Sequence, residues 1–398
     1  MIRYEEKDFR LAKEFCAVVL GTDQFYRNLP AEGADEASFS KEGMVPVDFS
    51  GVEPKEIHSW EEAIDELTRI YQEYGTIEDP TRRNYMFQQV GAFRKICMWL
   101  SGAPIQFREL AAETMFIDEN PIGAGFLQKK YDAMDAALAE AGYTGTMTEK
   151  LDAWKAARAV SAEDTERVLN ELLAEGKQRC IEKGFADAAA LDVKATVVYG
   201  KPYNGYCDYF TRTIEISGET LYTYEQLKHL VCHEAFPGHM THMAIRQRRV
   251  EAGEIPADAG LVVTNTPSSP TFEGIADTGM SFLDWDNTID DKICRYLNEI
   301  QAICNINASH IMYCQSGGAE AAREYLEKYS FASPAQIKSR LRYFGFPYRK
   351  AYMYSYWRGW EAVANKWESL AEEEKVPFLE YLYNHMHSVD TVAQFAQN

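Results

Sequence analysis

The chain has 398 residues, of which 46% are hydrophobic and 26% are charged, and its formal net charge is −20. This length and composition allow a large buried core, either in one domain or in two closely joined ones. The negative charge disfavours binding to nucleic acid and to acidic membrane surfaces, because both carry the same sign. It favours small or cationic ligands, although an acidic surface is also an ordinary route to solubility.

Targeting and redox signals point to one compartment. The first residues, MIRYEEKDFRLAKEF, carry charges throughout and lack the apolar stretch of a signal peptide. No segment offers the roughly 20 apolar residues that a membrane-spanning helix needs. The eight cysteines are scattered without a C-x-x-C pair, which is typical of reduced thiols in a core. We therefore expect a cytoplasmic protein.

Helical periodicity covers most of the chain. The stretch 59–74 opens with Ser59 and Glu62, a spacing that indicates a capping box at a helix N-terminus. Pro334 stands at the first position of another helix, where a proline is tolerated. Apolar residues at helical spacing predict further helices. These helices span residues 81–100, 126–142, 161–184 and 333–344.

Residues 193–217 depart from this helical pattern. They are rich in β-branched and aromatic residues with Gly and Pro breaks, and they predict two or three short strands. We therefore expect a mainly α-helical fold, with a small β-sheet directly before the helix that begins near Thr223. We divide the chain into an N-terminal helical region, residues 1–190, and a second region, residues 191–398, which carries the candidate catalytic motifs described below, joined in one continuous unit.

The segment HEAFPGHMTH, residues 233–242, carries the strongest chemical signal. Thr223 and Gln226 form a capping-box pair and predict a helix that leads into this segment. Half of the eight histidines of the chain lie between residues 229 and 242. This clustering argues against a set of unrelated core histidines.

The spacing of two of these histidines needs a break in the helix. His233 and His239 are six residues apart, which in an ideal helix means about 9 Å of rise and different faces. Two ligands placed so far apart cannot bind one ion. Pro237 and Gly238 are the residues that interrupt helices most strongly. We expect them to end the first helix and to bring His239 back beside His233.

The segment HEAFPGH resembles the H-E-A-x-P-G-H signature of the domain-of-unknown-function 885 family, which is placed among the gluzincin-like zinc metallopeptidases. The segment FEGIAD, residues 272–277, is similar to the context in which that family carries a glutamate ligand. Pro347, Ala351 and YWRG, residues 356–359, match a weaker pattern near the C-terminus. Met240 departs from the family, whose members usually have a second histidine there. The resemblance implies two helical halves around a deep cleft.

The resemblance also implies a Zn²⁺ site whose ligands are His233, His239 and Glu273. Two imidazoles and one carboxylate suit zinc and leave a position open for water. Glu234 points to a different side of the helix from His233, so we expect it to act as the general base toward that water. Asp277 lies one turn after Glu273, and gluzincins use an aspartate at this spacing to accept a hydrogen bond from a ligand histidine.

The C-terminal stretch YRKAYMYSYWRGWEAV supplies candidates for substrate binding. Tyr356 matches the tyrosine of the family, and its hydroxyl is our candidate for stabilising the oxyanion of the attacked carbonyl. Arg349 and Arg358 are candidates for binding a substrate carboxylate, because a guanidinium can donate two parallel hydrogen bonds to such a group. Tyr352 lies on the same helical face as Arg349.

The predicted strands next to the zinc helix supply a second group of candidates. Tyr203, with Asn204 and Tyr206, lies on the presumed edge of the sheet. By analogy with other zinc peptidases, we expect this edge to line the substrate site and to hold the peptide backbone as an added strand.

Each candidate has a structural alternative. Glu273 and Asp277 would otherwise form a solvated helical face, and the C-terminal aromatic residues would pack in the core. His229 and His233 also have the spacing of a metal-binding pair, but no glutamate follows His229, so this pair is not a hydrolytic arrangement. His242 could support His239, three residues before it, and His310 could hydrogen-bond a tetrahedral intermediate; a packing role is the alternative for both.

Together these features predict a zinc-dependent hydrolase that cleaves amide bonds in short peptides. An arginine at one end of the site would make it an exopeptidase with a preference for a free C-terminus. Two alternatives stay open: a metal-dependent amidase with a non-peptide substrate, and a metal-binding module without catalysis. Substrate profiling distinguishes the amidase from the peptidase. The presence of Glu234 argues against the non-catalytic metal-binding module, since a protein that only binds metal does not need a general base.

Overall fold

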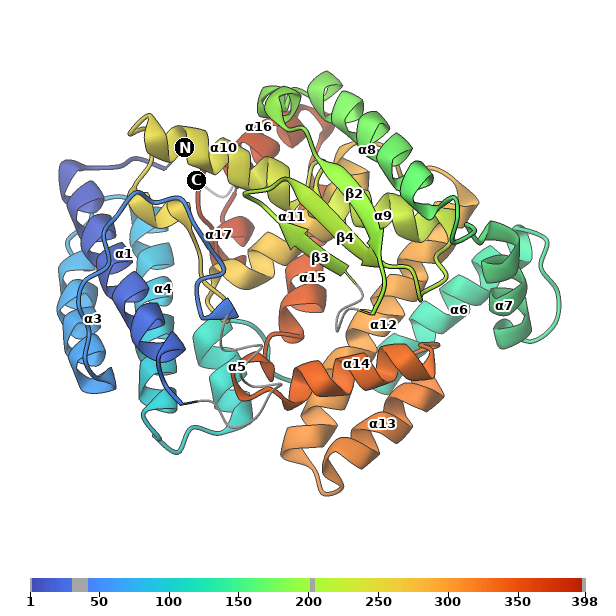
Figure 1. Ribbon diagram of the computed structural model, residues 1–398, viewed down its shortest axis with the longest axis horizontal. Coiled ribbons are helices and arrows are strands. Elements are labelled where there is room, and N and C mark those ends of the chain that lie inside the picture. The colour runs from blue at the N-terminus through green and yellow to red at the C-terminus, as the bar shows by residue number, and fades with distance from the viewer. Residues whose placement is uncertain (1, 31–41, 201–204, 396–398) are drawn as a thin grey trace. The chain divides into compact units, whose positions relative to one another are not determined.

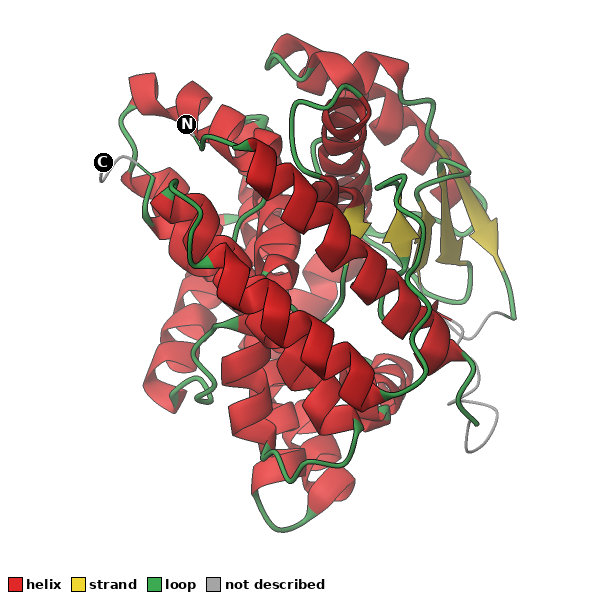
Figure 2. Cartoon of the chain, turned by 90° about the vertical axis from the view of Figure 1, so that its left-hand side faces the viewer, coloured by secondary structure: helices red, strands yellow, loops and turns green. Residues whose placement is uncertain are grey.

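The computed structural model describes residues 2–30, 42–200 and 205–395. Helices dominate it and the strands form only small sheets, so the predicted mainly α fold is confirmed (Figure 2). The chain divides into two compact units, each assembled from separate stretches of sequence. Unit 1 consists of Met1–Asn120, Ile245–Gly274 and Arg342–Asn398. Unit 2 consists of Pro121–Ala244 and Ile275–Leu341.

The chain passes from one unit to the other inside continuous helices. Three of the four boundaries fall within α10 (His239–Glu251), α11 (Ser268–Phe282) and α14 (Pro334–Gly345). None of them falls at residue 190. The assignment of a catalytic role to residues 191–398, and the cleft that the resemblance implies, stay predictions.

Unit 1 is built from helices around an apolar core. Helix α1 (Glu6–Arg27) packs against α3 (Trp60–Tyr74), and α4 (Pro80–Leu100) packs against both α3 and α5 (Phe107–Met115). Phe15, Leu67 and Phe93, from the first three of these helices, are buried together in that core. The other elements of this unit are β1 (Val47–Asp48), η2 (Ala257–Gly260), β5 (Leu261–Val262), η3 (Pro347–Arg349), α15 (Tyr354–Ser369), α16 (Glu372–Asn384) and α17 (Val389–Ala393).

A buried charge network ties distant segments of unit 1 together. Arg82 of α4 donates hydrogen bonds to Asp8 of α1 and to Asp258 of η2, at N–O distances between 2.7 and 3.0 Å. All three side chains are buried. Two carboxylates around one guanidinium compensate the loss of hydration that burial imposes on these charges.

Unit 2 places a small sheet among helices. Helix α12 (Ile289–Cys314) packs against α6 (Ala124–Glu140) and α13 (Gly318–Tyr329), while α8 (Thr165–Glu182) packs against α9 (Tyr224–Glu234). The other elements are α7 (Met147–Arg158), η1 (Ala186–Ala190), β2 (Lys194–Val198), β3 (Gly205–Asp208) and β4 (Thr213–Ser217).

The three strands of unit 2 are those predicted over residues 193–217. Their order is β2-β4-β3, with β2 parallel and β3 antiparallel to the central β4. Ile214 and Ile216 alternate along β4 and are buried, and Cys207 of β3 lies directly opposite Ile214. Helix α8 packs against β2 (Figure 1). Because directly opposed residues share a face of a sheet, Cys207 lies on the same face as the two isoleucines.

The helices predicted from periodicity agree with the structure to within a few residues. The corresponding elements are α3, α4, α6, α8 and α14. Ser59 accepts a hydrogen bond from the Glu62 amide, as the first half of a capping box requires, and the Glu62 carboxylate accepts from the amide of His58 rather than that of Ser59. Within the described residues, no helix is both long enough and apolar enough to cross a membrane.

Candidate metal centre

Helix α9 delivers His233 and Glu234 at its last turn. It begins with a complete capping box, in which Thr223 accepts from the Gln226 amide and the Gln226 side chain accepts from the Thr223 amide. Leu227 and Val231 form its buried apolar stripe. The helix ends at Glu234, where the predicted interruption follows.

The interruption after α9 turns the chain back on itself. The Phe236–Pro237 peptide bond is cis, and the amide of Gly238 donates to the Cys232 carbonyl at 2.9 Å. A Cβ atom at position 238 would lie 1.8 Å from the His233 carbonyl oxygen, so only glycine allows this close approach. Helix α10 then begins at His239, with Nε2 only 3.1 Å from Nε2 of His233. The two imidazoles thus lie together, as the spacing predicts.

Helix α11 brings Asp277 to the first of these imidazoles. The Oδ1 atom of Asp277 lies 2.7 Å from Nδ1 of His233. A carboxylate only accepts hydrogen bonds, so Nδ1 carries the proton and Nε2 presents its lone pair, which is the form that binds a metal. Burial by itself raises the pKa of Asp277, but His233 and His229 together hold it well below its usual value. The carboxylate is therefore ionised at neutral pH.

Glu273 completes a three-residue group with the two histidines. It lies one turn before Asp277 on the same continuous helix. One ligand atom each from His233, His239 and Glu273 lie within 4.8 Å of one another. His239 and Glu273 are buried, and the His233 side chain retains 12% exposure.

This donor set fits a zinc ion. Two nitrogens bound to one tetrahedral zinc at ~2.1 Å lie roughly 3.4 Å apart, close to the 3.1 Å that separates the two Nε2 atoms. Two neutral imidazoles and one carboxylate carry one negative charge in total, which attracts a divalent cation. The three residues therefore have the chemistry and the proximity of a zinc-binding set.

A tyrosine holds the carboxylate of Glu273. The Tyr352 hydroxyl donates to Oε1 of Glu273 at 2.7 Å. Burial raises the pKa of Tyr352 well above its usual value, and Glu273 raises it further, so the hydroxyl keeps its proton. The ring of Tyr356 lies 5.9 Å, centre to centre, from that of Tyr352. Tyr352 thus contacts a predicted ligand, and its contact with substrate stays a prediction.

Glu234 has a thiol as its neighbour. Cys207 of β3 forms a side-chain hydrogen bond with Glu234, in which the thiol donates to the carboxylate. Burial raises the pKa of the Cys207 thiol well above its usual value, and Glu234 raises it further. The thiol is therefore neutral and available as a donor.

His229 forms a second group with residues already described. Its Nε2 atom lies 3.4 Å from Oδ1 of Asp277, the same oxygen that faces His233. His229, His233 and Asp277 also meet the distance limits of a possible metal site. Because Asp277 uses one oxygen for both rings, the simplest role of His229 is to orient that carboxylate.

The two arginines predicted to bind a substrate carboxylate are already engaged. Arg358 is buried and donates to the carboxylates of Asp118 and Glu361 and to the backbone carbonyls of Asp118 and Asn120. Arg349 is buried and pairs with Glu42 at 2.7 Å. These contacts favour a packing role for both guanidinium groups.

The other predicted residues do not belong to this three-residue group, and two of them fall outside the described residues. Tyr203 and Asn204 fall outside the described residues, whereas Tyr206 of β3 is 49% exposed. His242 is buried within α10. His310 lines a cavity of about 420 Å³ beside α6, α12 and α13.

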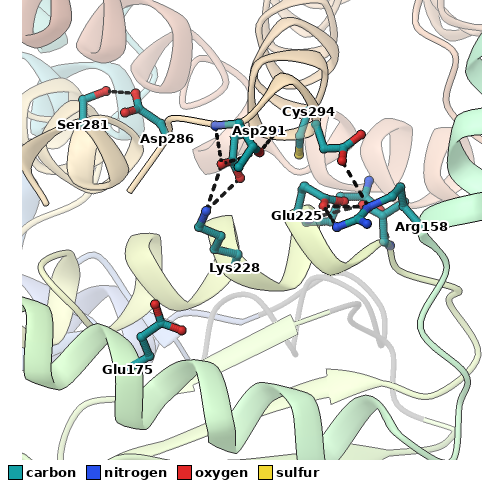
Figure 3. A network of polar contacts seen from close by, with 12 residues as sticks. Arg158, Glu175, Glu225, Lys228, Ser281, Asp286, Asp291 and Cys294 are labelled. Atoms are coloured by element: carbon teal, nitrogen blue, oxygen red, sulfur yellow. Dashed lines mark hydrogen bonds and ion pairs between the residues drawn. The ribbon is translucent and has the colours of Figure 1, made fainter. Parts of the chain in front are cut away.

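The buried side of α9 is anchored by ion pairs that the sequence did not suggest. Lys228 lies 2.9 and 3.0 Å from the two carboxylate oxygens of Asp291 in α12. Glu225 accepts from Arg158. Figure 3 shows both pairs on the side of α9 that faces α12. Neither pair has a sequence signal, because each joins segments more than 60 residues apart.

Comparison with known proteins adds information on the fold. No family model and no curated protein matches the chain. A solved structure described as "the putative lipoprotein from Colwellia psychrerythraea" is 14% identical, with a TM-score of 0.55 over 99% of this chain and 76% of that one. A second, described as "a putative lipoprotein of unknown function from Shewanella oneidensis", is 15% identical, with a TM-score of 0.52 over 98% and 73%. At these identities the similarity concerns the fold alone.

Proposed function

We propose that the protein is a gluzincin-like zinc hydrolase that cleaves amide bonds in short peptides. The observation that carries this proposal is the convergence of His233, His239 and Glu273 within 4.8 Å, next to a helix that ends in Glu234. A bound zinc would supply Lewis acidity and lower the pKa of water toward ~7.

Glu234 performs the proton transfers in this proposal. Its carboxylate takes a proton from the attacking water and returns it to the nitrogen of the leaving amine, so the residue ends the cycle ionised. The Cys207 thiol, hydrogen-bonded to Glu234, orients the carboxylate. Because the thiol is neutral, it can donate this hydrogen bond and places no second negative charge beside the carboxylate.

The remaining residues hold the ligands in place. Asp277 keeps His233 in the tautomer whose Nε2 faces the metal site. Tyr352 holds Glu273 through its hydroxyl. In this proposal the Tyr356 hydroxyl stabilises the oxyanion of the attacked carbonyl, because the Tyr352 hydroxyl already donates to Glu273.

The burial of the ligands supports a short substrate. His239 is 9% exposed and Glu273 is 4% exposed. A folded protein cannot bring its backbone to such side chains, whereas a flexible peptide can. This supports peptides over folded proteins as substrates, with exopeptidase action as the narrower form of the proposal.

The test combines metal analysis with hydrolysis. Zinc-loaded wild-type protein is incubated with a synthetic peptide library, with and without a chelator. The cleavage products are identified by mass spectrometry. We expect cleavage that the chelator abolishes. Glu234→Gln should bind zinc at the wild-type stoichiometry and lose at least ~10²-fold in kcat, since general base catalysis contributes about that much.

The matched control is Glu182→Gln, which makes the same change at an exposed position of α8. It should retain both zinc and activity. Turnover that persists in Glu234→Gln or in chelator would refute the proposal. Cleavage of simple amides without cleavage of peptides would instead favour the amidase alternative.

We also propose a cytoplasmic location. Six of the eight cysteines are buried thiols, which suits a reducing compartment. The two similar structures carry the word lipoprotein in their descriptions, which concerns those proteins. Cell fractionation followed by immunodetection tests the location, and recovery of the protein in an envelope fraction would overturn it.

A further inference from the structure

Arg212 has an unusual position in the hairpin that joins β3 to β4. It is the last residue before β4, and its backbone adopts a positive φ of 57°. Its carbonyl accepts a hydrogen bond from the amide of Lys194, the first residue of β2. A left-handed conformation costs a non-glycine residue about 1 kcal/mol or more. The hairpin therefore holds this arginine in a defined place despite a local cost.

The guanidinium of Arg212 is oriented but not neutralised. Its central carbon lies 3.9 Å from the centre of the Tyr209 ring, so the group stacks on an aromatic face. Its Nη1 atom is buried and has no hydrogen-bond partner within the described part of the chain. Among the same residues, no carboxylate forms an ion pair with it. The aromatic ring fixes the plane of the guanidinium, and no acceptor among the described residues takes its Nη1 donor.

Arg82 and Arg358 are more deeply buried than Arg212, and both have carboxylate partners. Arg82 is enclosed by Asp8 and Asp258. Arg358 is paired with Asp118 and Glu361. In a chain with a net charge of −20, a carboxylate is readily supplied. A buried donor of a charged group without an acceptor is costly, and an anionic ligand removes that cost.

The position of Arg212 links it to Glu234. Cys207 lies in the strand that pairs with β4, and its thiol is hydrogen-bonded to Glu234. Burial and the nearby carboxylates raise the pKa of Cys207, while the Arg212 guanidinium acts in the opposite direction. The strand register agrees, because Thr213, directly after Arg212, pairs with Asp208, directly after Cys207. Arg212 is thus close to the group that bonds the general base.

We propose that Arg212 recognises the terminal carboxylate of the peptide substrate, which makes the enzyme a carboxypeptidase or dipeptidase. This inference rests on the proposed function, because it places the carboxylate next to Glu234. The planar fork of an arginine matches a carboxylate with two parallel hydrogen bonds. Arg349 and Arg358, the candidates from sequence, are each ion-paired with a carboxylate of the protein.

The kinetic test uses pairs of peptides that differ only in a free or an amidated C-terminus. Wild-type enzyme should cleave the free acid with a kcat/KM at least ~10-fold higher. Arg212→Gln should lower kcat/KM for the acid by about 10- to 100-fold, mainly through KM, and leave the amide unchanged. Arg212→Lys should fall between the two. Arg323→Gln, an exposed ion-paired arginine of α13, should change neither substrate.

A binding measurement separates this proposal from the proposed function. The probes are an Ala-Phe dipeptide with a reduced, uncleavable central bond and its C-terminal amide, titrated calorimetrically into zinc-loaded protein. Wild-type protein should bind the acid at least ~10-fold more tightly than the amide, and Arg212→Gln should bind both alike. Equal binding by wild-type protein, including binding of neither probe, overturns the role of Arg212. Loss of peptide cleavage with this preference intact overturns only the proposed function.

Discussion

Asp277 shows how one side chain sets the state of a whole site. Its Oδ1 atom lies 2.7 Å from Nδ1 of His233 and 3.4 Å from Nε2 of His229. By accepting from both rings it fixes a tautomer in one and a position in the other. A neutral amide cannot do this equally well, because one of its two heavy atoms is a donor.

We expect Asp277→Asn to lower zinc affinity by about 10- to 100-fold, the usual effect of removing a group that orients a ligand histidine. The asparagine can present its NH₂ group to His233 and favour the wrong tautomer. Competition with a chromophoric chelator measures the change. Asp284→Asn, the same change at an exposed residue just after α11, should keep the wild-type affinity. Equal affinities for the two variants would remove Asp277 from the site.

At the scale of elements, α9 is the helix whose placement decides the geometry of the site. It carries His229, His233 and Glu234, and it is anchored to α12 by the buried pair of Lys228 and Asp291 (Figure 3). Lys228 also lies over the Trp285 ring. Because both charges are buried, removal of one of them leaves the other without compensation.

We expect Lys228→Met to lower the free energy of unfolding by roughly 3–5 kcal/mol, since Asp291 then remains buried and unpaired. The double variant Lys228→Met with Asp291→Leu should recover much of this loss, because no unpaired charge remains. Denaturant unfolding provides both values. Arg167→Ala, which breaks an exposed pair with Glu171, should cost less than about 1 kcal/mol. A loss of that small size for Lys228→Met would show that the pair does not hold α9.

At the scale of the whole molecule, two buried histidines tie stability to pH. Burial lowers the pKa of His385 to about 3 and that of His387 to about 4. An unfolded histidine has a pKa of ~6.5. Between these values the unfolded chain binds more protons than the folded one, so stability falls as the pH falls. The contribution of the two neutral rings is complete above about pH 6.5 and decreases toward pH 4 and below.

We expect His387→Gln to reduce this loss of stability between pH 6.5 and 4. The Nε2–H group of His387 donates to the Tyr381 carbonyl at 2.8 Å, and a glutamine amide keeps a donor there. At ~1.36 kcal/mol per pKa unit, the loss of unfolding free energy over this range should be smaller than that of the wild-type protein by at most roughly 3 kcal/mol. Denaturant unfolding at several pH values measures the slope. His58→Gln, at an exposed position, should keep the wild-type profile, and identical profiles for all three proteins would contradict the assignment.

Much of the local structure was determined by the sequence alone. Thr223 and Gln226 cap α9 as predicted, and Gly238 allows the chain to turn back so that His239 meets His233. Helix caps, helix breaks and the alternation of strands depend on residues only a few positions apart, so their spacing carries the information.

The tertiary structure alone decided which partners the charged side chains take. The guanidinium of Arg358 meets Asp118 and that of Arg349 meets Glu42, and both contacts join segments hundreds of residues apart. Periodicity places a side chain on a face of its own helix, but it does not specify what packs against that face. For the same reason the stacking of Arg212 on Tyr209 emerged only once the hairpin and its surroundings were folded.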